Sequence, residues 1–334
     1  MGQNSKLYYE AGQTLVSMAA LTHDGDQKTF LSAKTLWSDY PGYAPTVLPN
    51  AVLSGGIIIP SVSETNDYID VSAVYCYLNG VEKTGSNKIA ADTDVAITRD
   101  GGSAYQKHSI TVNSSGVIAV VAGTAHTAFS DTRGANGGPP LIPVDSIEIG
   151  QVHLSSASAG LITSDEIFQV PGTHREQITS YNILYSNVEN RTIGYAGVQF
   201  VSTLPLIHTG GVPAAVYAEF YEPSFTEIQN VRNLQPPRNS GSVSSETYYG
   251  TTKGSTSTSL NAGSFEYSPS DGISDDFMGK IGNKMWFKFY EDYLKDPYEI
   301  FQGRPFDTGN YPAEGVMNWT INVVAEDVAE RVIA

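Results

Sequence analysis

The sequence has almost no cysteine, since Cys76 is the single one. With one thiol no disulfide can form within the chain. Zinc and iron–sulfur sites built from several thiolates are excluded for the same reason. Cys76 lies in a run of β-branched and aromatic residues, so we expect a small buried side chain there rather than a reactive thiol.

Positive charge is also scarce. The chain has 19 Lys and Arg against 35 Asp and Glu, which gives a formal net charge of −16. Proteins that hold nucleic acid tightly neutralise its phosphates with Lys and Arg, so we predict no such binding. Charged residues make up 16% of the chain and aromatic residues 10%, a composition that favours a folded protein over a disordered one.

Long apolar runs are missing. The longest, residues 117–122, is far shorter than the ~18–20 residues that a membrane helix needs. The N-terminus has no basic segment followed by an apolar stretch, the pattern of a secretory signal. We therefore expect neither a membrane partner nor secretion.

Motifs for catalysis and metal binding are not found either. The chain contains no Gly-x-Ser-x-Gly and no Walker loop. Asp92-Thr93-Asp94 lacks the third acid and the glycine of a calcium loop, and we interpret such acidic clusters as polar turns. We predict a protein that is not an enzyme, with no catalytic residue, no cofactor and no metal site.

The histidines do not form a recognisable site. No pair has the i, i+4 spacing of a helical zinc site, and we interpret them as surface or loop residues. They are His23, His108, His126, His153, His174 and His208.

The sequence is rich in β-strand patterns. Residues 69–78 are β-branched and aromatic and end at Asn79-Gly80, a strong hairpin signal. Ile147–Leu154 alternates with a period of two, as a half-exposed strand does, and Gly150 marks a bulge. Further strands are predicted at residues 95–98, 109–112, 117–121 and 193–222, and in the aromatic run 285–290.

The C-terminal part contains the cleanest strand. In residues 316–323 the apolar Met317, Trp319, Ile321 and Val323 alternate with Asn318, Thr320 and Asn322, which predicts one buried and one polar face. Before it, residues 291–301 have the spacing of a short helix interrupted at Pro297.

Residues 239–272 are dominated by Ser, Thr and Gly. Such a segment buries little, so we interpret it as a mobile loop or an extended hairpin that becomes ordered against a neighbouring subunit. We hypothesise that residues 239–263 and the strand at 316–323 make contacts between subunits.

These patterns predict a mainly β fold, a β-sandwich or partial barrel with little helix. The 334 residues suffice for one large β domain or roughly two smaller ones. We expect an N-terminal arm or loop region at 1–56 and a C-terminal tail at 326–334. Between them, residues 57–325 would form a β-rich domain with long loops or a small inserted subdomain.

Such a fold suggests assembly rather than chemistry. Sheet edges must be paired, covered or blunted. Copies of one chain that pair their edges and close by rotation form a ring, and stacked rings form a tube.

Three collinear strings carry a resemblance to a known family. They are residues 110–156, 163–176 and 204–223, and they include the unusual runs GGPPLIP at 137–143 and FQVPG at 168–172. The chain resembles, over roughly residues 57–290, the major tail (tail tube) proteins of long, flexible-tailed bacteriophages, particularly the larger versions in flagellum-seeking phages.

The resemblance implies a function and partners. Sheets from six copies would join into an inner β-barrel, and hexameric rings would stack into the virion tail after assembly in the host bacterial cytoplasm. The implied partners are further copies of the chain and the tape-measure, tail-terminator and tail-tip proteins. DNA would pass through during ejection, and a lumen lined by Asp and Glu would repel its phosphates.

Two alternatives stay open. A receptor- or carbohydrate-binding tail tip or fibre protein would use exposed aromatic rings to stack on sugars, and the chain has 20 tyrosines. Fibres usually show repeats or coiled-coil segments, however, and neither is visible. An enzyme that degrades host polysaccharide ranks third, because no catalytic motif supports it.

Overall fold

The computed structural model describes residues 4–33, 35–177, 180–185, 196–248, 251–269, 275–295, 297–310 and 317–333. The prediction of a mainly β fold is confirmed: the chain forms several antiparallel sheets, none closed into a barrel. Within these residues helical structure is limited to the 3₁₀ turns η1 (Gly85–Asn87), η2 (Ser164–Glu166) and η5 (Met278–Lys280). No helix of the described part could span a membrane.

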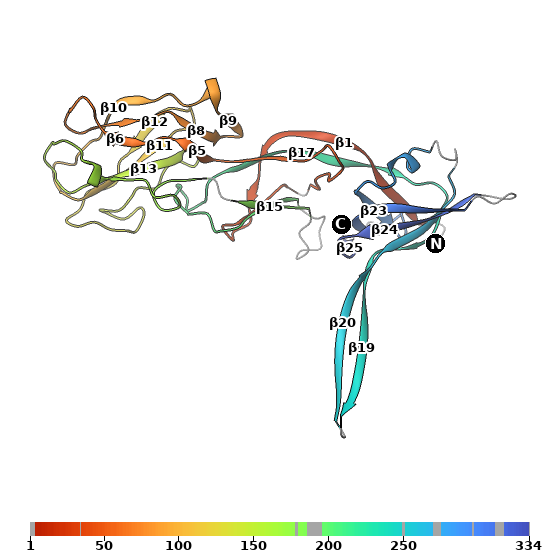
Figure 1. The fold of residues 1–334 in the computed structure, drawn as a ribbon. Helices are drawn as coiled ribbons and strands as arrows, with labels where there is room; N and C mark the ends of the chain where they lie inside the picture. The colour runs from red at the N-terminus through yellow and green to blue at the C-terminus, as the bar shows by residue number, and fades with distance from the viewer. Residues whose placement is uncertain are drawn as a thin grey trace.

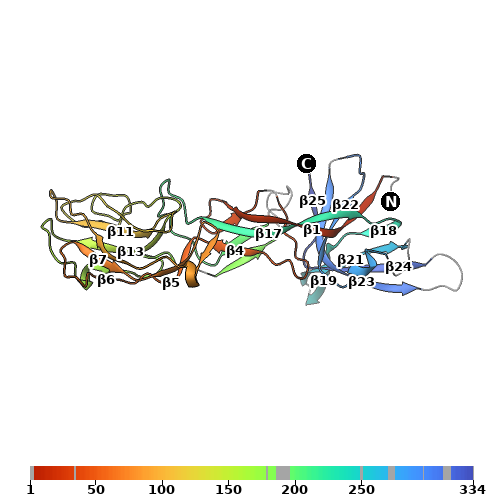
Figure 2. The same cartoon turned by 90° about the horizontal axis from the view of Figure 1, so that it is seen from above.

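The molecule is elongated, with a β-sandwich at one end and a large sheet at the other (Figure 1). Both termini lie at the end of the large sheet, and strands β1 (Lys6–Ala20) and β17 (Val216–Glu227) run between the two ends (Figures 1 and 2). We call the far end, strands β5 to β14, the distal sandwich.

The distal sandwich contains three small sheets, ordered β12-β11-β13-β14, β10-β7-β6 and β5-β8-β9. They surround one hydrophobic core that includes Val52, Ile69, Cys76, Ile110 and Ile149. The expectation that Cys76 is buried is confirmed. The strands are β5 (Ala51–Gly55), β6 (Ile58–Pro60), β7 (Tyr68–Val71), β8 (Val74–Leu78), β9 (Val81–Lys83), β10 (Asp92–Ala96), β11 (Gln106–Val112), β12 (Ile118–Val121), β13 (Ile147–Leu154) and β14 (Ile167–Phe168).

Two local predictions hold in the sandwich and one is wrong. Asn79 and Gly80 both have positive φ, 50° and 72°, and join β8 to β9 in a hairpin, as the Asn-Gly signal requires. A bulge does occur in β13, where Ile110 pairs with Gly150 but Thr111 pairs with Glu148. The expected half-exposed character of β13 is wrong: seven of its eight residues are buried, because the loop carrying Arg133 covers the outer face at Glu148.

The large sheet has the strand order β18-β21-β24-β23-β22-β1-β17-β4, and β25 pairs with β23. Its aromatic core includes Tyr9, Phe265, Phe287, Phe301 and Trp319. The strands not yet given are β4 (Thr46–Pro49), β18 (Val231–Gln235), β21 (Gly263–Tyr267), β22 (Met285–Tyr290), β23 (Tyr298–Asn310), β24 (Asn318–Ala325) and β25 (Glu330–Val332).

The two terminal regions differ from expectation. Residues 6–20, expected within an arm or loop region, instead form β1, which lies inside the sheet between β17 and β22. Leu7 and Tyr9 are buried in the core, and this burial favours a strand over a free arm. In the expected tail 326–334, Glu330–Val332 forms β25, and Val332 is buried.

A buried carboxyl group marks a bulge in β1. The register with β17 shifts between Glu10 and Gly12, and the Glu10 side chain is buried. It accepts hydrogen bonds from Gln13 Nε2 at 3.0 Å, from the Trp286 backbone N–H at 3.1 Å, and from the Ser38 hydroxyl. Burial raises the pKa of Glu10, and these hydrogen bonds partly oppose the shift.

The sequence also made predictions for strand β24 and for residues 291–301, and the structure agrees with the first and not with the second. In β24, Trp319, Ile321 and Val323 are buried while Thr320 and Asn322 are exposed, as the alternation predicts. Met317 does not follow the pattern, because it precedes the strand and is 40% exposed; residue 316 lies outside the described part. The predicted helix at 291–301 is wrong, because residues 298–301 begin β23. Phe301 pairs with Phe287 across β22 and their rings stack at 5.3 Å.

A small sheet of order β15-β16-β3-β2 fills the middle of the molecule. Its core holds Trp37, whose ring stacks on Phe220 with centroids 4.8 Å apart. The strands are β2 (Thr22–His23), β3 (Thr29–Leu31), β15 (Tyr181–Leu184) and β16 (Gly197–Phe200). Of the predicted strand region 193–222, residues 193–195 lie outside the described part.

One histidine lies inside the distal core. His108 is on the side of β11 that carries Ile110 and Val112, its exposure is 0%, and neither ring nitrogen has a hydrogen-bond partner among the described residues. Burial, with a smaller effect from the positive charge of Arg99, lowers the pKa of His108 to about 4. The folded protein therefore holds this ring neutral.

Acid should destabilise the protein through His108. An unfolded histidine has a pKa near 6.5, so below that pH the unfolded state binds a proton that the folded state refuses until about pH 4. The free energy of unfolding should fall across this window by up to about 3 kcal/mol from this group. The His108→Leu variant should lack this contribution to the pH dependence. Urea denaturation of both proteins at a series of pH values measures the free energy of unfolding of each. Parallel pH profiles for the two proteins would contradict the assignment; the buried carboxyl groups affect both equally.

Candidate functional sites

The Ser- and Thr-rich segment forms a long hairpin. Strands β19 (Arg238–Tyr248) and β20 (Thr251–Asn261) have 11 residues each and pair continuously from Arg238 opposite Asn261 to Tyr248 opposite Thr251. Of the two forms expected for this segment, the extended hairpin is therefore the one observed. At ~3.3 Å per residue it spans roughly 35 Å, and it projects away from the large sheet (Figure 1).

Nothing in the described part of the chain extends this hairpin into a larger sheet, since β19 and β20 pair only with each other. Near its base the contacts are hydroxyl pairs, Ser240 with Ser259 at 2.9 Å and Ser242 with Ser257 at 2.7 Å between Oγ atoms. Residues 256–261 are exposed. An isolated two-stranded hairpin is marginally stable in water, so packing on a further surface would stabilise this one.

The base of the hairpin is attached to the large sheet. The Arg238 guanidinium forms an ion pair with the buried Glu299 of β23 and donates to the Ala329 carbonyl at 3.5 Å. The hairpin is thus held at one end and free of the described chain beyond it. This geometry suits a contact with another molecule.

The large sheet offers two further surfaces. Its path ends at β18 on one side and β4 on the other. On the exposed face of β23 and β24, Phe306 and Val324 are 45% and 54% exposed among polar neighbours such as Thr320 and Asn322. This face and the edge strand β18 are largely exposed, whereas three of the four residues of β4 are buried.

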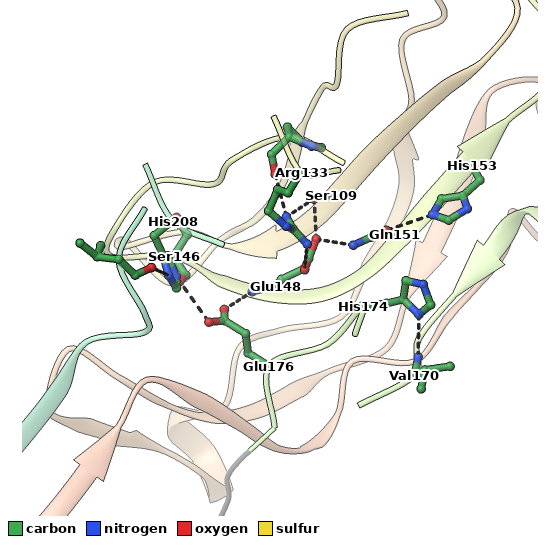
Figure 3. Close-up of polar contacts among 12 residues, drawn as sticks. Ser109, Arg133, Ser146, Glu148, Gln151, His153, Val170, His174, Glu176 and His208 are labelled. Atoms are coloured by element: carbon green, nitrogen blue, oxygen red, sulfur yellow. Dashed lines mark hydrogen bonds and ion pairs between the residues drawn. The ribbon is translucent and has the colours of Figure 1, made fainter. Parts of the chain in front are cut away.

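A buried polar cluster connects the distal sandwich to the rest of the chain (Figure 3). Glu148 accepts hydrogen bonds from Arg133 Nη2 at 2.6 Å, Ser109 Oγ at 2.5 Å and Gln151 Nε2 at 3.1 Å. Glu176 accepts the Glu148 backbone N–H at 2.7 Å. The two carboxyl groups are buried, as Glu148 and Glu176 are 1% and 7% exposed.

His208 completes the cluster from the segment between β16 and β17. Its Nε2 lies 3.1 Å from the Ser146 carbonyl oxygen and 3.4 Å from Glu176 Oε1. Burial raises the pKa of Glu176 well above its ordinary value, and burial lowers the pKa of His208. We therefore describe Glu176 as neutral. Burial also raises the pKa of Glu148, but the adjacent Arg133 charge opposes this shift, so we describe Glu148 as the ionised partner of Arg133.

Paired carboxyl groups can act as general acid and general base, but a catalytic pair must lie within hydrogen-bond distance of its substrate. Here Glu148 is saturated by three donors and Glu176 is covered. The cluster joins β11, β13, the Arg133 loop and the His208 segment. We interpret it as a structural joint that fixes the distal sandwich to the connecting strands.

The interpretation of the histidines as surface or loop residues is wrong for His108, which lies in strand β11. His208 does lie in a loop, between β16 and β17. His108 and His208 are both completely buried. The signal for His108 was present in the sequence, because it alternates with Ile110 and Val112. Nothing around His208 could have indicated burial, since the partners Ser146 and Glu176 are distant in sequence.

The prediction of a polar turn is wrong for the acidic cluster Asp92-Thr93-Asp94, because these residues lie in strand β10. Asp94 has a positive φ of 58° and accepts hydrogen bonds from the Ser61 and Ser63 hydroxyls at 2.7 and 2.6 Å. Its backbone N–H donates to Asp70 at 2.8 Å. These contacts stabilise β10 where its register with β7 shifts between Asp92 and Val95. In the described part of the chain no three His, Cys, Asp or Glu side chains are grouped as metal ligands would be.

Comparisons of the chain with protein-family models, with curated proteins and with solved structures find no match.

The two carboxyl groups of the joint should differ sharply in tolerance to substitution. Glu148→Gln leaves the Arg133 charge buried without its counterion and should cost about 3 kcal/mol of unfolding free energy. Glu176→Gln replaces a neutral group by a neutral one that still accepts the backbone N–H, and should cost at most about 1 kcal/mol. Urea denaturation of both variants measures the difference. Equal costs would show that the ionisation states are assigned wrongly.

Proposed function

We propose that this chain is a structural virion protein, the tail tube protein of a long, flexible-tailed bacteriophage, which polymerises as stacked rings. The observation that carries the proposal is the hairpin β19–β20. It is attached to the large sheet through Arg238 and Glu299, and its strands form a sheet of their own. A monomeric protein gains nothing from an arm of this length, whereas a neighbouring copy supplies the surface it needs.

The open large sheet supports the same proposal. It is antiparallel and ends on one side at β18, an exposed edge strand, and an edge of this kind can pair with a further strand. Six copies related by rotation, the number that the family resemblance implies, would continue one sheet into the next and close an inner barrel. Successive rings would then be connected by the hairpins.

The charge balance supports passage of DNA. With 35 acids against 19 bases, a closed ring of copies would repel phosphates overall rather than hold them. We propose that the DNA is conducted and not bound, and that the tape-measure, tail-terminator and tail-tip proteins are the other partners, in the tail of the virion. The distal sandwich, at the end opposite the hairpin (Figure 1), would face outward.

The alternative, a receptor- or carbohydrate-binding tip or fibre protein, has one observation in its favour. A group of aromatic rings including Phe129 and Phe168 lies on the distal sandwich beside a hollow. The hollow lies on the sandwich and the hairpin at the far end of the molecule, so the two features do not compete for one surface. A sugar site and a tube function are therefore compatible in one chain.

Shortening the hairpin tests the proposal. Removing residues 243–256 and joining Ser242 to Ser257 through Asn-Gly keeps the register of the base. We expect loss of tubes in negative-stain electron microscopy and a folded monomer in analytical ultracentrifugation. A control that removes only residues 248–251 at the tip, and joins Thr247 to Thr252 through Asn-Gly, should retain more assembly. Tubes of normal length from the shortened chain would refute the assignment.

A further inference from the structure

A hollow of about 790 Å³ lies on the outer surface of the distal sandwich. Its floor is formed by three neighbouring strands: Lys107 of β11 is opposite His153 of β13, and Phe168 of β14 is opposite Gln151, two residues from His153. Phe129, from the loop after β12, and His174 complete the lining. The hollow therefore lies on the face of the sheet opposite the hydrophobic core.

Four rings pack against one another in this hollow. The His153 and Phe168 rings stack with centroids 4.0 Å apart and an interplanar angle of 20°. Phe129 lies 5.9 Å from His153, and His174 lies 5.5 Å from Phe168. Phe129 remains 41% exposed, so part of this aromatic surface faces solvent.

Hydrogen bonds fix the two histidine rings, and that of His153 is connected to the buried joint (Figure 3). His153 Nε2 contacts Gln151 Oε1 at 2.9 Å, and Gln151 Nε2 donates to Glu148 at 3.1 Å. The Val170 backbone N–H donates to His174 Nδ1 at 3.3 Å. A surface whose side chains are already fixed loses little entropy when a ligand binds.

These contacts also assign the protons of both histidines. Because the Gln151 amide nitrogen donates to Glu148, its oxygen must accept, so His153 carries its proton on Nε2 and Nδ1 is left as an acceptor. His174 accepts at Nδ1, so its Nε2 carries the proton and can donate. Burial and the Lys107 charge lower the pKa of His153 to about 3 and also lower the pKa of His174. Both rings are neutral at physiological pH.

The charged groups of the rim discriminate among ligands. Lys107 Nζ contacts Asp131 at 2.9 Å and lies 5.5 Å from the Phe129 ring centroid. Asp165 and Glu166 add two carboxyl groups. The carboxyl groups of the rim would repel an anionic ligand. A cationic ligand would bind best over the Phe129 ring, but Lys107 already lies there and would repel it. A neutral ligand with both apolar and hydroxyl surface is repelled by neither the carboxyl groups nor Lys107.

We propose that this hollow is a binding site for a pyranose sugar. The C–H face of the sugar ring would pack on Phe129 and Phe168, where the apolar surfaces are complementary. Its hydroxyl groups, each a donor and an acceptor, match the acceptor of His153, the donor of His174 and the carboxylate of Asp165. The site would take a single neutral sugar unit of a larger glycan.

Saturation-transfer difference NMR on the full-length protein tests the site. The probes are the methyl β-glycosides of glucose, galactose and N-acetylglucosamine, with choline as the cationic comparison. We expect transfer to ring C–H protons of at least one glycoside, and binding roughly tenfold weaker in Phe129→Ala. The matched control is Phe306→Ala, which removes a phenylalanine of similar exposure, 45% against 41%, from the large sheet.

A second measurement keeps the proposal testable should Phe129→Ala alter the loop. The ring ¹H–¹⁵N correlations of His153 and His174 should shift on titration with the same glycoside, and those of His23 should not. Absence of transfer from every glycoside, or equal binding by Phe129→Ala and wild type, would overturn the proposal. Transfer to choline alone would overturn it in favour of a cation site.

Discussion

The pairing of β1 with β17 is the constraint on which the rest of the structure depends. The ladder extends from Tyr8 opposite Glu227 to Ala20 opposite Tyr217, with two register shifts. At one end β1 pairs with β22 in the large sheet, and at the other β17 pairs with β4, beside the start of the distal sandwich. The ladder is thus a continuous antiparallel connection between the large sheet and the region beside the distal sandwich.

The fold class was predictable from sequence because its signals are local. The alternation around Trp319 and Ile321, the Asn79-Gly80 turn and the Ser/Thr composition of the hairpin each depend on a few adjacent residues. The role of β1 was not predictable, because its neighbours β17 and β22 lie more than 190 residues away. Residues 298–301 were misassigned because an i, i+3 spacing of aromatic residues fits a helix until the partner strand is known.

The candidate sites show the same limit. Sequence could indicate that the Ser/Thr segment lacks a core of its own, since composition alone decides that. It could not bring together Glu148, Glu176 and His208, whose contacts depend on three separate segments. Nor could it bring Phe129 to His153. Buried polar groups must find partners wherever the fold supplies them, so such clusters become visible only in three dimensions.

The burial of Cys76 has a practical consequence. The side chain lies in the middle of β8 with 0% exposure, and burial raises the pKa of its thiol to about 11. A thiolate is the reactive form, so an alkylating reagent can modify this chain only after the sandwich opens locally. No second cysteine competes for the reagent. The rate of alkylation therefore measures how often the distal sandwich opens locally, both in the free chain and in any assembly that it forms.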